Sequence, residues 1–394
     1  MKRYIIILAL LTGLTTTCFA QQYGWIDISN NLPASSGIVT LPDMCWVNEN
    51  EGWICSSATG EIYHTTDGGN TFTTQTTQYY TNAIHMLNAN EGYAGGYQGR
   101  VYRTTDGGAT WNVLGSIGGT LLSISFPPSS TTGYCCGYTG RIYRITSSGV
   151  SSMSSGVSSN LASISFPGSQ GWTCGEDVIE HYDGSSWLLD QYAPYGTYNA
   201  IYMINSSTGW AVGDNGLIIK TTDGINWNSQ SNPDTSKRTL LDVFFLDASN
   251  GWAVGNSGVI LHTTNGGTTW AIEGSGLTTN MLSSVQFTSP TNGYVLGNNG
   301  TLLHYTSHST GVPEVIKDED IIVLPNPTNG IVRFSLQGNV PVKRIGVFDM
   351  QGKQVLHIDK ATDNYIDLSG LGNGIYLLQL ETPDKIFKQK IIKK

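Results

Sequence analysis

A glycine followed by tryptophan or tyrosine recurs along this chain at a nearly constant interval of 38 to 42 residues. Self-similarity with such a period marks a protein built from repeated supersecondary units, so it constrains the fold more than any single motif does. Seven pairs define seven units. They are Gly52-Trp53, Gly92-Tyr93, Gly133-Tyr134, Gly171-Trp172, Gly209-Trp210, Gly251-Trp252 and Gly293-Tyr294.

Each unit carries the signals of four short strands. In the sixth unit an alternating apolar stretch at 241–246 precedes the glycine-aromatic strand at 251–255. A turn ending in Gly258 leads to a third strand at 259–263, and a Thr-Thr-x-Gly-Gly turn then leads to an aromatic residue that opens a fourth. Four antiparallel strands in about forty residues are typical of a β-propeller blade. The 48 glycines also disfavour long helices. We therefore predict an all-β fold.

The two ends of the repeat array complement each other. The seventh unit stops after the strand at 302–306 and has no fourth strand, whereas an orphan strand at 25–29 precedes the first unit. The orphan strand aligns with the fourth strand of unit six at 270–274. Because an unpaired sheet edge is a liability, we expect the N-terminal strand to complete the last blade. The sequence thus predicts one seven-bladed propeller over residues 21–306.

The turn between third and fourth strands resembles the Asp-box, a BNR-like repeat with the pattern Ser/Thr-x-Asp-x-Gly-x-Thr-Trp/Phe. It is complete at 65–72 and 104–111, carries asparagine for aspartate at 263–270, is one residue short at 221–227 and survives as a remnant at 183–187. A short carboxylate can accept backbone N–H groups across such a turn, and its glycines allow positive φ. We assign a structural role to Asp67, Asp106, Asp183, Asp223 and Asn265.

The repeat as a whole is similar to that of photosystem II stability/assembly-factor-like propellers. Residues 209–227 and 251–270 match that pattern best, and a weaker repeat covers 23–306. Members of that family in photosynthetic cells act as assembly factors. A secreted relative cannot do that job, so the resemblance implies the scaffold and not the function.

The N-terminus reads as a signal peptide over residues 1–20. Lys2 and Arg3 precede an apolar stretch at 5–14, which is too short to span a membrane, and a small-x-small site at 18–20. No other segment qualifies as a transmembrane span. A lipoprotein anchored through Cys18 is the alternative, although the threonines at 15–17 match lipoprotein processing poorly.

Five cysteines remain after this cleavage. Cys55, Cys136 and Cys174 occupy a repeat position that carries valine or leucine in other units, which indicates small buried hydrophobic residues. Cys45 and Cys55 flank the turn at 48–52, so a cross-strand disulfide between them stays open. No cysteine pair has zinc-ligand spacing. We predict no metal site and no cofactor.

The last 74 residues change in character. A linker at 307–320 precedes a lysine-rich segment, 321–394, that resembles the type A C-terminal sorting domain of type IX secretion. That resemblance implies a small Ig-like β-sandwich read by the type IX machinery, and a protein secreted or attached to the outer cell surface via the periplasm. A terminal module without a transport role is the alternative. The matching motif residues are Pro325, Asn326, Pro327, Gly330, Asp349, Gly352 and Gly374.

The charge distribution excludes one class of partner. Residues 21–320 hold 8 Lys+Arg and 23 Asp+Glu, a net charge of −15, whereas residues 321–394 have a net charge of +4. A body this acidic cannot neutralise a phosphate backbone, so we predict no nucleic-acid binding.

Binding is the function that we predict, on the face formed by the turns between second and third strands and the linkers between blades. The ligand is a surface glycan or a protein. The linkers contribute Tyr79, Tyr80, Tyr195 and Tyr198. Units two and three share a Gly-Tyr-x-Gly-Arg turn, which contributes Tyr97, Arg100, Tyr138 and Arg141. Such residues suit anionic groups and flat ring faces. Linker aromatics that only fill gaps between blades are the alternative.

Two further arginines provide an internal contrast. Arg103 and Arg144 lie three residues further along the same strands, so they are predicted to point to the opposite side.

The alternative function is a secreted glycoside hydrolase of the Asp-box type. The body lacks the arginine-rich signature of sialidases and has seven repeats instead of their six blades, so we assign no catalytic residue.

Overall fold

The computed structural model describes residues 22–33, 40–190, 193–308, 321–336, 341–349, 353–359, 364–382 and 386–394. The predicted signal peptide at 1–20 and most of the predicted linker at 307–320 lie outside these residues. Contacts divide the chain into a unit that spans Tyr23–Ser307 and a second unit that contains the C-terminal segment from His308 onward. No helix in the described ranges is long and apolar enough to cross a membrane.

Seven four-stranded sheets make up the described part of the first unit. Blade one contains β2 (Asp43–Trp46), β3 (Gly52–Cys55), β4 (Glu61–Thr65) and β5 (Thr73–Thr76). Blade two contains β6 (Thr81–Met86), β7 (Gly92–Gly96), β8 (Arg100–Thr104) and β9 (Asn112–Ser116). Blade three contains β10 (Leu121–Ser125), β11 (Gly133–Gly137), β12 (Arg141–Thr146) and β13 (Gly149–Met153). Blade four contains β14 (Leu161–Ser165), β15 (Gly171–Gly175), β16 (Val178–Tyr182) and β17 (Trp187–Leu189).

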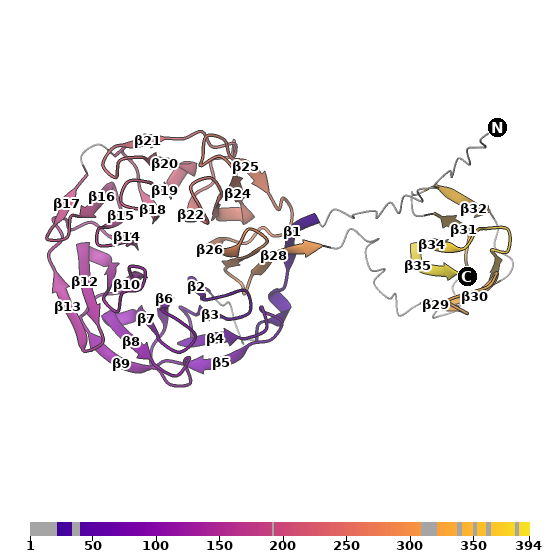
Figure 1. Ribbon diagram of the computed structural model, residues 1–394, viewed down its shortest axis with the longest axis horizontal. Coiled ribbons are helices and arrows are strands. Elements are labelled where there is room, and N and C mark those ends of the chain that lie inside the picture. Colours follow the sequence, from indigo (N-terminus) through magenta and orange to yellow (C-terminus); the bar gives the residue numbers. More distant parts are fainter. Residues whose placement is uncertain are drawn as a thin grey trace, which may run out of the picture. The chain divides into compact units, whose positions relative to one another are not determined.

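The remaining blades follow the same order. Blade five contains β18 (Tyr198–Met203), β19 (Gly209–Gly213), β20 (Ile218–Thr221) and β21 (Trp227–Ser229). Blade six contains β22 (Leu240–Phe245), β23 (Gly251–Gly255), β24 (Ile260–Thr263) and β25 (Ala271–Glu273). Blade seven contains β26 (Leu282–Ser289), β27 (Asn292–Gly297), β28 (Leu302–His308) and β1 (Gln22–Asp27). The first strand of each blade faces the centre of the ring (Figure 1). Single 3₁₀ turns cover Ser29–Asn31, Tyr97–Gly99, Tyr138–Gly140, Asp214–Gly216 and Asn256–Gly258.

The N-terminal strand closes the ring, as the sequence predicts. β1 lies at the outer edge of blade seven, next to β28. It begins at Gln22 and ends at Asp27, slightly earlier than predicted, and Ile28 N continues the pairing with a 2.9 Å bond to Leu302 O. The buried Trp25 packs edge-on against Phe287 and donates its indole N–H to Glu273 of blade six at 3.2 Å.

The glycine-aromatic pair forms the contact between neighbouring blades. In blade six, Phe245 at the end of the first strand lies opposite Gly251, and a β-carbon on that glycine would come within 2.4 Å of the phenylalanine ring. The other face of Phe245 stacks on Trp210 of blade five, with ring centroids 3.4 Å apart. The glycine makes room for a ring that the preceding blade's aromatic residue then covers. The same stack joins Trp252 to Phe287 and Tyr294 to Trp46.

The Asp-boxes are compact hydrogen-bonded turns. Asp67 accepts bonds from the hydroxyl and the N–H of Thr71 at 2.6 and 2.9 Å, and these bonds lower the pKa of its carboxyl. Asp106 and Asn265 accept the equivalent N–H groups of Thr110 and Thr269. Asp223 and the remnant Asp183 accept N–H groups two and three residues ahead.

The boxes of blades two, five and six also offer a carbonyl to the preceding blade. The indole N–H of Trp53 donates to Gly107 O at 3.0 Å, that of Trp172 to Gly224 O and that of Trp210 to Gly266 O. The boxes therefore connect neighbouring blades on one face of the ring. We call that side the box face, and the side with the second-to-third-strand turns and the blade linkers the turn-and-linker face.

The five described cysteines are buried and free. The disulfide between Cys45 and Cys55 that the sequence left open is not formed: Cys45 lies opposite Trp53, and Cys55 lies opposite Asp43. The two thiols are therefore diagonal, at a separation that a disulfide does not span. Burial raises the pKa of the Cys45 and Cys136 thiols to about 12.

The C-terminal unit is a two-sheet β-sandwich, in agreement with the prediction. One sheet contains β29 (Ile321–Leu324), β30 (Ile331–Leu336) and β33 (Tyr365–Asp367). The other contains β32 (Gln354–Ile358), β31 (Arg344–Phe348), β34 (Gly374–Glu381) and β35 (Ile386–Lys393). Both sheets contribute to one core, in which Val332, Val347 and Leu378 are fully buried.

The sorting-motif residues occupy turns and strand ends of this sandwich. The Asn326 side chain bonds to Lys390 O at 2.6 Å and Ile392 N at 2.9 Å, between the exposed Pro325 and Pro327. Gly330 O accepts Leu368 N, and Asp349 accepts Lys353 N. Gly374 begins β34 opposite Lys393. Gly352 lies outside the described residues.

Candidate binding site

A central channel opens on the turn-and-linker face. Its volume is about 410 Å³. All seven first strands or the residues just before them contribute to the wall. The wall includes Asp43, Asn82, Ser123, Ser163, Asn199, Asp242 and Ser284. The ring therefore places a cavity with a mixed polar and apolar wall beside the turns and linkers that the sequence predicts for binding.

Polar side chains in the channel wall join each blade to the next. Ser123 accepts Ile164 N at 3.2 Å and Ser163 accepts Ile201 N at 3.3 Å. Asp43 and Asp242 do the same with Ile84 N at 2.9 Å and Val285 N at 2.8 Å. The sequence analysis did not identify these residues. A polar residue within an apolar strand, as in Leu241-Asp242-Val243, was the available signal.

Two channel carboxyl groups titrate near neutral pH. Burial raises the pKa of Asp43 to about 6 and that of Asp242 to about 7. Both oxygens of each group accept backbone N–H bonds, the second pair coming from Met44 and Val243. Their geometry is that of structural acceptors between blades, because neither oxygen of either carboxyl is left without a donor.

The predicted residues around the entry to blade two form one group, which we call the blade-two cluster: the exposed Tyr97 and the half-buried Tyr79, Tyr80 and Arg100. The Arg100 guanidinium lies 4.5 Å from the Tyr79 ring centroid and donates to Gln78 at 3.2 Å. The Tyr80 and Tyr97 rings are 4.6 Å apart. An arginine and three tyrosine rings thus converge on the linker between blades one and two.

In blade three the corresponding residues, Tyr138 and Arg141, make different contacts from Tyr97 and Arg100. Arg141 donates to Ile117 O at 3.2 Å and to the Tyr143 hydroxyl at 3.3 Å, while Tyr138 is 46% exposed and lines the channel. Each arginine therefore contacts the linker that leads into its own blade. No hydrogen bond, ion pair or ring contact within the described residues joins Arg141 or Tyr138 to the blade-two cluster.

The two remaining predicted tyrosines, Tyr195 and Tyr198, differ in solvent exposure. Tyr195 is 89% exposed. Tyr198 is 1% exposed, belongs to the core around Trp172 and donates its hydroxyl to Pro194 O. The expectation that Tyr198 offers a ring face to a ligand is wrong, because it begins β18 and its side chain points into the space between blades four and five.

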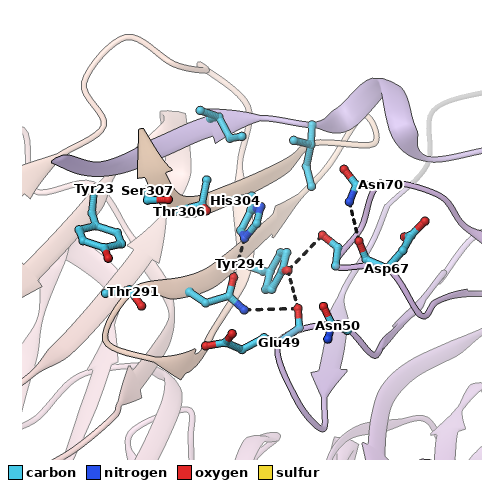
Figure 2. Close-up of a pocket in the computed structure, with 14 residues that line it drawn as sticks. Tyr23, Glu49, Asn50, Asp67, Asn70, Thr291, Tyr294, His304, Thr306 and Ser307 are labelled. Carbon is cyan, nitrogen blue, oxygen red and sulfur yellow. Dashed lines mark hydrogen bonds between the residues drawn. The ribbon is translucent and has the colours of Figure 1, made fainter. Parts of the chain in front are cut away.

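The box face carries a second cavity, of 370 Å³, at the junction of blades seven and one (Figure 2). The Tyr294 hydroxyl donates there to Gly68 O at 3.1 Å and Glu49 O at 3.3 Å. Burial lowers the pKa of His304 to about 4, so its ring is neutral at pH 7 and shares a 2.5 Å bond with Asn292. Blade seven has no box because its last two strands come from opposite ends of the unit.

Comparisons with known proteins agree with this architecture. Residues 322–394 match the family of secretion system C-terminal sorting domains. Residues 191–274 and 226–306 match the family of the photosynthesis system II assembly factor YCF48. No curated protein sequence matches the chain significantly.

Solved structures show the same fold. A structure of YCF48 bound to D1 peptide superposes with a TM-score of 0.61 at 20% identity, covering 74% of this chain and 97% of that one. YCF48 from Cyanidioschyzon merolae gives a TM-score of 0.59 at 18% identity, covering 72% and 98%. The WD40 propeller domain of Doa1 gives 0.59 at 10% identity, covering 73% and 97%.

Proposed function

We propose that this chain, which combines a seven-bladed propeller of the YCF48 type with a type IX C-terminal sorting domain, acts outside the cell as a non-catalytic binding module. The sorting domain supports export through the type IX machinery. The propeller is then released into the medium or attached to the outer cell surface. Its ligand is a protein segment that binds on the turn-and-linker face.

The observation that carries this proposal is the blade-two cluster beside the channel. Tyr79 and Tyr80 on the linker meet Tyr97 and Arg100 on the turn of blade two, all of them exposed or half-buried, and Tyr138 lines the channel. Tyrosine and arginine are the residue types that most often anchor protein interfaces. Arg100 and Arg141 also place positive charge on an otherwise acidic body, which favours ligands with carboxylate groups. The peptide in one YCF48 structure supports a ligand of this class.

The bonding of the titratable groups supports a non-catalytic role. A glycoside hydrolase needs two carboxyl groups that can reach a sugar. Asp43 and Asp242 in the channel are instead bonded to backbone N–H groups of neighbouring blades. Third-strand histidines are paired as well: His64 with Glu51, His181 with Asp190 and His262 with Glu273.

The proposal is tested by capture from the surface proteins of a host that carries the type IX machinery, with a glycan array run beside it. The full chain should retain one protein partner, and Arg100→Ala combined with Arg141→Ala should reduce that retention at least tenfold. Arg103→Ala is the matched control, because this arginine is paired with Glu91 on the opposite side of the strand. Equal loss in the control would contradict a site at the blade-two cluster. Release of sugar from any arrayed glycan would contradict the non-catalytic role.

A further inference from the structure

The propeller places one basic side chain of each third strand opposite the aromatic residue of the glycine-aromatic pair. The seven residues are His64, Arg103, Arg144, His181, Lys220, His262 and His304. Six of them have a partner within the ring. The partners are Glu51, Glu91, Asp190, Gly266 O, Glu273 and Asn292. Arg144 alone makes no hydrogen bond or ion pair with any residue that the structure describes.

Blade two shows what such an arginine binds. Glu91 precedes the Gly92-Tyr93 pair, and its Oε1 accepts bonds from Arg103 Nε at 3.1 Å, from Arg103 Nη2 at 2.8 Å and from the Tyr93 hydroxyl at 3.2 Å. One carboxylate oxygen is thus held by a guanidinium and a phenol. Charge-assisted bonds of this kind are among the strongest in proteins.

Blade three repeats the two donors without the carboxylate. Tyr134 and Arg144 face each other in the same register as Tyr93 and Arg103. The residue before the glycine is Thr132, whose short hydroxyl side chain cannot replace the carboxylate of Glu91. The Tyr134 hydroxyl has no hydrogen-bond partner among the described residues. Two donors arranged for a carboxylate are therefore left open.

These donors line a cavity of 770 Å³ between blades three and four on the box face. It forms where blade four retains only the box remnant at 183–187. Tyr134 is fixed by stacking on Phe166, with ring centroids 3.9 Å apart. The wall also contains Pro127, Ser152, Ser169 and Tyr182. The cavity combines aromatic rings, short hydroxyl side chains and one guanidinium that has no partner in the described parts of the chain.

We propose that this cavity binds an acidic sugar, a uronic acid unit of a polysaccharide, through its carboxylate. The carboxylate takes the place that Glu91 holds in blade two, between Arg144 and the Tyr134 hydroxyl. A uronic acid carries its carboxylate and several hydroxyl groups on one rigid ring. That combination matches an arginine bordered by serine hydroxyls and tyrosine rings, whereas the carboxylate of a peptide would leave those hydroxyls unused. This site lies on the opposite face from the blade-two cluster and does not depend on it.

Titration calorimetry of the full chain with a trimer of galacturonic acid tests the proposal. The wild type should bind this trimer at least tenfold more tightly than a neutral trimer of galactose. Arg144→Ala should weaken binding at least tenfold, and Arg103→Ala should leave it within twofold of wild type. Thr132→Glu should abolish binding while keeping Arg144, because it supplies the carboxylate from within the chain, as Glu91 does.

Several outcomes would overturn the inference. They are an absence of binding by the wild type at millimolar trimer, equal affinity for the neutral trimer, or an Arg144→Ala variant that folds normally and binds unchanged. Tighter binding of a triglutamate peptide that is also lost in Arg144→Ala would overturn the assignment to a sugar. The variant that combines Arg100→Ala with Arg141→Ala should bind the trimer normally. The calorimetry therefore tests the cavity independently of the proposed function.

Discussion

At the scale of single residues, the contacts between blades depend on a glycine that leaves space for a large aromatic ring on the neighbouring strand. Phe245 lies between Gly251 of its own blade and Trp210 of the preceding one. Such an arrangement has no room for one additional carbon atom, because protein interiors are close-packed. The glycine of each pair is therefore as informative as the aromatic residue that follows it.

Gly251→Ala should destabilise the propeller by about 1–3 kcal/mol, the usual cost of overpacking a core. The added β-carbon would meet the Phe245 ring at 2.4 Å, so the stack with Trp210 must shift. Chemical denaturation measures the change. Gly168→Ala is the control, because nothing lies within 4 Å of its β-carbon position. Identical midpoints for the two variants would contradict this explanation of the motif.

The channel carboxyl groups predict a pH dependence of stability. Asp242 has a folded pKa of about 7, above the value of about 3.9 expected in the unfolded chain. Between these values the folded state keeps a proton that the unfolded state has released. Stability is therefore fully present below about pH 4 and falls as pH rises through about 7. Asp43, with a pKa of about 6, acts in the same direction.

Asp242→Asn should flatten this dependence, because the amide does not titrate. Between pH 4.5 and pH 8 the wild type should lose on the order of 2 kcal/mol more of its free energy of unfolding than the variant does. Urea denaturation at a series of pH values measures the slope. Asp223→Asn is the control: its hydrogen bonds lower the pKa of that carboxyl, so it stays ionised in both states over this range. A variant with the wild-type slope would show that Asp242 is not the titrating group.

At the scale of elements, β1 turns an open array of strands into a ring. It covers the edge of β28 and brings Trp25 against Phe287 and Glu273. Closure of this kind connects the two ends of the repeat array and gives blade seven its fourth strand.

Deletion of residues 21–30 should therefore lower the melting temperature markedly. Trp25→Ala should account for about 3–5 kcal/mol of the loss, the usual cost of removing a buried tryptophan. Ile26→Ala on the same strand is the control, since Ile26 is 37% exposed. An unchanged melting temperature after the deletion would mean that the N-terminal strand does not close the ring in solution.

At the scale of the whole molecule, the chain consists of two units with separate cores. The propeller clusters contain residues from Tyr23–Ser307, and the sandwich core contains residues from Val323 to Ile391. A chain whose units have separate cores can be cut between them without unfolding either part.

Truncation after Ser309 should give a folded propeller that stays in the periplasm of a host with the type IX machinery. The sorting domain is gone, while the described residues of the propeller core are intact. Fractionation with a blot against the propeller locates the protein, and its melting temperature should match that of the propeller in the full chain. Normal arrival of the truncated protein in the medium or on the cell surface would contradict the sorting role of the tail.

The sequence by itself determined the features that are local and repeated. The forty-residue period predicted the blades, and the missing and spare strands at 302–306 and 25–29 predicted the closure. Both depend on residues close together in the chain or on a pattern sampled seven times, so local backbone preferences and periodic burial are enough to predict them. The sandwich was expected only from the resemblance of the segment with Pro325 and Gly374 to the sorting-domain family.

Only the tertiary structure decided which residues of neighbouring blades meet. Tyr195 and Tyr198 lie three residues apart on one linker, yet one is exposed and the other is buried between blades. Asp242 reaches Val285 N in the next blade, and Arg144 lacks the carboxylate that Arg103 has. The first of these contacts joins positions about forty residues apart. The second difference arises because Thr132 stands where blade two has Glu91. Their geometry is set when the ring closes and each blade packs against the next, and spacing along the chain does not encode it.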